Sequence, residues 1–96
     1  MIIELKKFGQ TLTSRDEGRE AFAAFTPTLN TVRENELVKI HFFGINTLSP
    51  SWADEFITPL LKRFNGRLTL VDVSNPSVKA TIELLEKING ISFNVK

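Results

Sequence analysis

The chain has 96 residues, 42% of them hydrophobic, which is enough for one domain built around one apolar core. Twelve lysines and arginines balance eleven aspartates and glutamates, and a net charge of +1 argues against nucleic acid as the main ligand. The lack of cysteine excludes a disulfide framework, a thiolate metal site and a cysteine nucleophile.

The first predicted element is a strand over residues 2–8. This run starts with two isoleucines, places alternate apolar residues on one face and ends before Gly9. Lys6 and Lys7 near its end favour a position at the edge of the sheet, because charged side chains protect an unpaired strand edge from further pairing.

An amphipathic helix is predicted next. Ser14 stands three residues before Glu17, the spacing of a capping box, and apolar residues then recur every three or four positions as far as Leu29. Pro27 lacks a backbone N–H and is expected to end or kink this helix. Gly18, inside the first turns, predicts the close approach of another segment.

The second predicted strand covers residues 37–43 and has one largely apolar face. Side chains alternate between the two faces of a strand. One face would carry Val38, Ile40 and Phe42, and the other Lys39, His41 and Phe43. His41 is the only histidine, and its place in this alternation favours a structural role over that of a catalytic base.

The second predicted helix begins near Ser49. Its apolar residues follow at helical spacing: Ala53, Phe56, Ile57, Leu60, Leu61 and Phe64. By propensity alone, Ser49 or Ser51 is the helix cap and Pro50 fills the first helical position. Pro59 in the third turn is expected to bend the helix.

The last part of the chain predicts a buried strand over residues 67–73, a third helix and a short final strand. Asn75 and Pro76 mark the start of the helix, and Gly90 marks its end. The apolar residues assigned to its inner face are Val78, Ile82, Leu85 and Ile88. The final strand is assigned to the alternating residues Ile91, Phe93 and Val95.

The resulting element order, β-α-β-α-β-α-β, predicts a single α/β domain over residues 1–96. A strand, a crossover helix and the next strand form a right-handed parallel unit, so we expect a four-stranded, mainly parallel sheet. The helices are expected to cover one face of that sheet.

Two motifs in the chain resemble the STAS-like domain family of unknown function. The first is Ser14-Arg15-Asp16-Glu17-Gly18-Arg19, similar to the family's Ser-Arg followed closely by Gly-Arg. The second is Ser49-Pro50-Ser51-Trp52-Ala53-Asp54-Glu55-Phe56, similar to the family's Ser-aromatic-Ala-Asp-Glu-apolar run after the second strand. Together with the element order, the motifs extend the resemblance over nearly the whole chain, and they imply a STAS-like fold.

The resemblance implies a bacterial regulatory module without enzymatic activity, because related STAS domains act as anti-sigma-factor antagonists. In those antagonists, a partner kinase of the anti-sigma type phosphorylates a serine at the start of the equivalent helix and so dissociates the complex. Ser51 is the best match to that serine, although a strict alignment puts Pro50 there. The implied partner is such a kinase or ATPase, or a similar signalling protein, and the implied contact residues are Ser49, Ser51, Trp52, Asp54 and Glu55.

A polar cluster is expected where the two motifs meet. Asp54 is predicted to face Arg15 or Arg19, whereas the plainer alternative is that Asp54 and Glu55 only complement the helix dipole. If the two arginines instead hold an anion, the same strand-end cleft suits a small-molecule or nucleotide sensor. Trp52 is more typical of a core anchor than of an exposed contact.

An enzyme is the least favoured class of function. No nucleophile-base pair, metal-ligand set or cofactor motif is present, so neither a cofactor nor a metal is expected. The chain has no signal-peptide pattern and no apolar run of about 20 residues that would span a membrane, which makes the cytoplasm the expected location.

Overall fold

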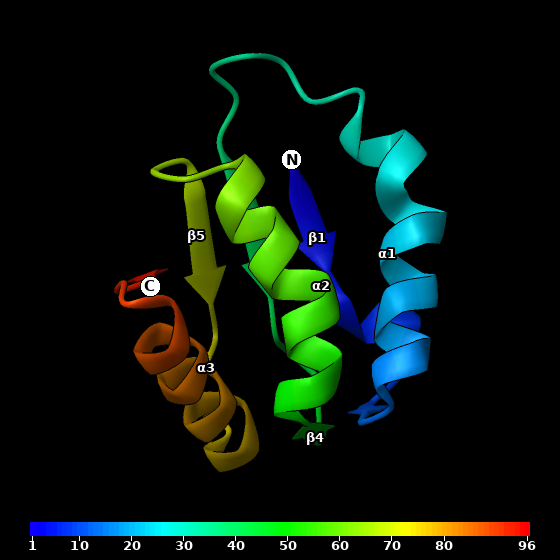
Figure 1. Ribbon diagram of the computed structural model, residues 1–96, viewed down its shortest axis with the longest axis vertical. Helices are drawn as coiled ribbons and strands as arrows, with labels where there is room; N and C mark the ends of the chain where they lie inside the picture. The colour runs from blue at the N-terminus through cyan, green and yellow to red at the C-terminus, as the bar shows by residue number, and fades with distance from the viewer.

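The computed structural model describes all 96 residues and contains a four-stranded sheet (Figure 1). Its strands are β1 (Ile2–Glu4), β3 (Val38–His41), β5 (Leu68–Val71) and β6 (Asn94–Val95). Their order is β1-β3-β5-β6, and every neighbouring pair is parallel. The α/β class, the parallel sheet and the edge position of the first strand are therefore confirmed.

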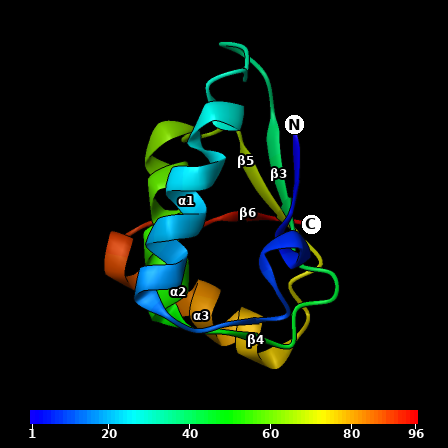
Figure 2. The ribbon, with the colours of Figure 1, turned by 90° about the vertical axis from the view of Figure 1, so that its right-hand side faces the viewer.

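Three helices pack on this sheet: α1 (Arg15–Leu29), α2 (Pro50–Arg63) and α3 (Pro76–Asn89). Figure 2 shows α1 and α2 on one side of β3 and β5, with no helix over the opposite side of the sheet. In Figure 1, α2 runs between α1 and α3. None of the helices combines the length and the apolar character that a membrane span needs.

One core of 22 buried apolar residues fills the space between the sheet and the helices. Val38, Ile40 and Phe42 all point into it, as the alternation predicts, whereas Phe43 is exposed. An aromatic group packs at the α1 and α2 end of this core, with ring centroids 5.0 to 6.1 Å apart, and consists of Phe8, Phe22, Phe25, Trp52 and Phe56.

The first strand is shorter than predicted. It ends at Glu4, opposite the last residue of β3, and residues 5–8 form the 3-10 helix η1. Without a strand partner beyond Glu4, the chain turns back and places Phe8 against Phe25 and Phe56. The ammonium of Lys7 lies 4.2 Å from the centroid of the Phe25 ring, so this lysine packs on the aromatic group.

A second, two-stranded parallel sheet was not predicted. It pairs β2 (Thr11–Leu12) with β4 (Thr47–Leu48), and strands of two residues are too short to show a period in the sequence. Each strand leads directly into a helix, β2 into α1 and β4 into α2. This small sheet therefore holds the starts of α1 and α2 next to each other.

Three predictions about the last third of the chain were wrong in detail. Ile88 is 66% exposed and does not belong to the inner face of α3. That face includes Thr81, whose hydroxyl donates to the carbonyl of Leu48 at 2.6 Å. The strand predicted for residues 67–73 ends at Val71, because Asp72 leaves the extended conformation with a φ of 64°. The final strand β6 has only two residues.

Both internal prolines are tolerated by their helices. α1 continues two residues beyond Pro27, and α2 continues past Pro59 to Arg63. The carbonyl that Pro27 leaves without its usual partner belongs to Ala23, an exposed residue, so water can satisfy it. The expected helix end near Pro27 is therefore displaced by two residues.

Gly18 is predicted to be required at the crossing of α1 and α2. A Cβ atom there would lie 2.7 Å from the carbonyl oxygen of Trp52 and 3.1 Å from its Cα. We expect Gly18→Ala to lower the free energy of unfolding by about 1 to 2 kcal/mol, because forcing the backbones apart outweighs the better helix propensity of alanine. Urea unfolding measures this, and Ala24→Gly, at an exposed position, reports the propensity term alone. A Gly18→Ala protein as stable as the wild type would contradict the close approach.

Glu36 is predicted to make stability depend on acidic pH. Its Oε2 accepts from the ammonium of Met1 at 2.8 Å and its Oε1 from the backbone N–H of Arg33 at 3.1 Å, and these bonds, the ammonium first, lower the pKa of Glu36. Because the pKa is lower in the folded than in the unfolded state, the stabilisation is present at neutral pH. It is lost as pH falls through the lowered pKa.

An NMR titration should therefore give Glu36 a midpoint below the ordinary pKa of a glutamate. Glu36→Gln should also lose less stability than the wild type when the pH falls from about 6 to about 3. Glu34→Gln is the control, since Glu34 is exposed and forms no ion pair. An ordinary midpoint for Glu36 would show that the Met1 contact is not formed.

Candidate functional site

The starts of α1 and α2 are fixed by two serine caps. The hydroxyl of Ser14 accepts from the backbone N–H of Glu17 at 3.2 Å, and that of Ser49 accepts from the backbone N–H of Trp52 at 3.1 Å. Ser49 also donates to the carbonyl of Thr13 at 2.8 Å, one residue before the α1 cap. The cap of α2 thus ties the two helix starts together.

Arg15 lies across the first turns of α2. Its Nη1 is 3.2 Å from Oδ2 of Asp54 and 3.2 Å from Oε1 of Glu55. Arg19, one turn further along α1, reaches Glu55 at 3.6 Å and Asp16 at 3.3 Å. The contact predicted between the two sequence motifs is therefore present, and we call these five residues the bridging cluster.

The bridging cluster pairs each of its two arginines with carboxylates. Hydrogen bonds to Asp54, and then to Glu55, raise the pKa of Arg15 above its ordinary value and keep the guanidinium charged. The second oxygen of Asp54 accepts from the Thr58 hydroxyl at 3.0 Å, so this carboxylate is oriented from both sides. Sequence reasoning missed Thr58, although its i,i+4 spacing from Asp54 is the signal for such a bond.

The structure separates the residues proposed as contacts into exposed and buried ones. Ser51 is half-buried and its hydroxyl has no protein partner, while the side chains of Asp54 and Glu55 are 42% and 25% exposed. Trp52 is only 1% exposed and stacks on Phe56 at 5.0 Å, so its assignment as a surface contact is wrong. The available contact surface excludes the tryptophan.

His41 lies apart from this cluster, on the face of the sheet that no helix covers. Its Nδ1 is 3.9 Å from Oε1 of Glu4 on the neighbouring strand, and its side chain is 29% exposed. Across the chain, no group of three or more histidine and acidic side chains is placed to hold a metal ion. The arrangement around His41 is that of a structural side chain on a sheet surface.

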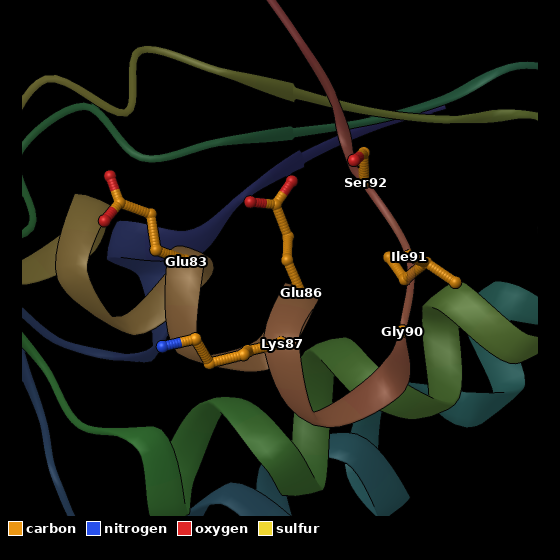
Figure 3. Close-up of a pocket in the computed structure, with 6 residues that line it drawn as sticks. All are labelled: Glu83, Glu86, Lys87, Gly90, Ile91 and Ser92. Atoms are coloured by element: carbon orange, nitrogen blue, oxygen red, sulfur yellow. The ribbon is translucent and has the colours of Figure 1, made fainter.

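The main hollows of the surface lie away from the bridging cluster. Figure 3 shows one of about 470 Å³ at the end of α3, where the carboxylates of Glu83 and Glu86 lie on one side of the helix and Lys87 points to the other. Oε2 of Glu86 accepts from the backbone N–H of Phe93 at 2.7 Å, which explains this carboxylate as a support for the turn into β6.

Ser49 and Ser51 are predicted to differ sharply on substitution. Ser49→Ala removes a helix cap and a tie to Thr13, so we expect a loss of about 1 to 2 kcal/mol in the free energy of unfolding. Ser51→Ala removes a hydroxyl without a partner and should change stability by less than about 0.5 kcal/mol. Chemical denaturation of both proteins measures the difference, and equal losses would contradict the assignment of Ser49 as the cap.

Comparison of the chain with protein-family models, with curated proteins and with solved structures gives no match. No family is therefore shown by similarity, and the resemblance to STAS-like domains rests on the two motifs and the element order. The geometry adds one fact to that resemblance: the motifs, which residues 20–48 separate in the sequence, form one exposed surface through Arg15, Asp54 and Glu55.

Proposed function

We propose that this chain is a non-enzymatic regulatory domain of the STAS-like type that binds another protein. Its contact surface is formed by the exposed parts of Arg15, Arg19, Ser51, Asp54 and Glu55. The observation that carries the proposal is the bridge from Arg15 to Asp54 and Glu55, which joins the two STAS-like motifs at one end of the molecule.

The charges at this surface favour a protein partner over a small anion. Both arginines already face carboxylates, so an anion would have to displace Asp54 or Glu55 to reach a guanidinium. None of the main hollows is lined by these residues, and enclosed pockets are what small ligands use. An exposed surface of polar and charged side chains is typical of the rim of a protein contact.

Ser51 is the residue at which this contact would be regulated. Its hydroxyl is partly accessible and has no structural task, whereas modification of Ser49 would break the cap of α2. A phosphate on Ser51 would lie near the start of α2 and one turn from Asp54 and Glu55, where it adds negative charge to the surface without unfolding the helix. By resemblance, the modifying partner is a kinase of the anti-sigma type.

The proposal is tested by affinity capture from the source cell with the wild type and with Ser51→Ala, Ser51→Asp and Ser51→Arg. Mass spectrometry identifies the captured proteins and any phosphorylated Ser51 peptide. We expect a partner that the wild type and Ser51→Ala both retain and that Ser51→Asp loses, because the added carboxylate stands in for the phosphate. Ser51→Arg should also lose it, since a long side chain at this point obstructs the surface.

Glu83→Arg is the matched control, because it changes an exposed charge on α3 away from the contact surface. It should retain the same partner. A partner retained equally by all variants would place its contact elsewhere on the domain. If instead no variant captured a protein and a small molecule co-purified with each, the protein-binding role would be rejected.

A further inference from the structure

A separate hollow lies where β3 and β5 end, the two inner strands of the sheet. It is about 420 Å³ in volume and is lined by residues 42–46 together with Asp72, Ser74 and Asn75. Its lining residues come from two separate segments, the loop after β3 and the turn from β5 into α3. None of the residues of the bridging cluster lines this hollow.

Two side chains of the hollow are exposed and only weakly engaged: Phe43 contacts the Lys6 ammonium alone, and the Asp72 carboxylate has no hydrogen-bond or ion-pair partner. Phe43 is a large apolar residue and is 63% exposed. Asp72 is exposed and forms no salt bridge, and it is the only residue other than glycine with a positive φ. The ends of β3 and β5 lie side by side, because His41 pairs with Val71. Phe43 and Asp72 follow these two strand ends, so an aromatic ring and a carboxylate line the same hollow.

The walls of the hollow are held in place by Asn75. Its Nδ2 donates to the carbonyl of Ile45 at 3.2 Å, and its Oδ1 accepts from the backbone N–H groups of Ser77 and Val78 at 2.8 and 3.1 Å. One carboxamide therefore caps α3 and fixes the loop after β3. A ligand would meet a preformed site, which lowers the entropic cost of binding.

The Phe43 ring already interacts with a cation. The ammonium of Lys6 lies 5.1 Å from the ring centroid, although Lys6 does not line the hollow. An aromatic face attracts cations through its quadrupole, and most of this ring remains open to solvent. The free carboxylate of Asp72 adds the negative charge that a cationic group requires.

We propose that this hollow binds the guanidinium of an arginine side chain presented by a partner protein. A guanidinium is planar, so it can stack on Phe43 while it donates two parallel hydrogen bonds to Asp72, and a lysine ammonium can do only one of these well. This inference is independent of the contact at the starts of α1 and α2 and can hold or fail without it.

The test uses N-acetyl-argininamide as the probe, with the neutral isostere N-acetyl-citrullinamide as the matched control. In amide NMR spectra of the full chain, the arginine probe should shift Gly44, Asn46 and Asp72 with a dissociation constant on the order of 1 mM, as expected for a single side chain. The citrulline probe should produce no such shifts. Equal binding of both probes, or shifts away from the hollow, would overturn the proposal.

Three substitutions then test the roles of the individual groups. Asp72→Asn keeps a residue that tolerates a positive φ and should weaken binding about tenfold. Phe43→Leu keeps an apolar side chain and should weaken it about threefold. Lys6→Met removes a repelling cation and should tighten binding, whereas weaker binding would contradict electrostatic attraction of the guanidinium to the hollow.

Glu20→Gln is the control for the general loss of negative charge, because Glu20 is exposed on α1 and forms no ion pair. It should bind the arginine probe as the wild type does. An equal effect of Glu20→Gln and Asp72→Asn would reduce the interaction to long-range electrostatics and reject a built site. Unchanged binding by Asp72→Asn would reject it as well.

Discussion

The contact between Gly18 and the backbone of Trp52 is the constraint on which the bridging cluster and the packing of α1 on α2 depend. Only a residue without a Cβ lets α1 approach the carbonyl of Trp52 so closely. That approach has two consequences on opposite sides of the contact. Toward the core, Trp52 is buried and stacks on Phe56; toward solvent, Arg15 lies within reach of Asp54 and Glu55.

The small sheet of β2 and β4 explains why this crossing occurs at the helix starts. Leu12 and Leu48 pair in it, and the backbone N–H of Ser49 donates to the carbonyl of Leu12 at 2.9 Å. Two helices that leave the same small sheet must start side by side. The positions of the two helix starts, and with them the packing of α1 on α2 and the bridging cluster, are thus set by the residues just ahead of both helices.

Much of this arrangement could be predicted from local patterns. Serine is a residue type favoured at helix caps, and Ser14 and Ser49 are caps in the structure. The alternation around Ile40 likewise identifies the buried face of β3. Both signals could be read because they depend on near neighbours in the sequence. The sheet of β2 and β4 could not be predicted, since two-residue strands have no period. Trp52 was ambiguous because its burial depends on Gly18, 34 positions away and on another helix.

The misassignment of Ile88 has a similar cause. A prediction from periodicity assigns the apolar residues of a helix to its buried face, and isoleucine is buried more often than threonine. The hydroxyl of Thr81, however, satisfies the carbonyl of Leu48 at 2.6 Å, a partner that no sequence pattern reveals. A hydrogen-bonded polar residue therefore shares the inner face of α3 with Val78, Ile82 and Leu85. The hollow near Asp72 was missed because it arises where separate strand ends meet.

The contact surface and the hollow are held at a fixed separation by the loop between β3 and β4. On one side, the backbone N–H of Asn46 donates to the carbonyl of Gln10 at 2.8 Å; on the other, Asn75 holds the carbonyl of Ile45. The N–H of Leu48 continues this attachment by donating to the hydroxyl of Ser77 at 3.1 Å. Because the loop is bonded to both sides, a partner that touched both proposed surfaces would meet a spacing fixed by these hydrogen bonds.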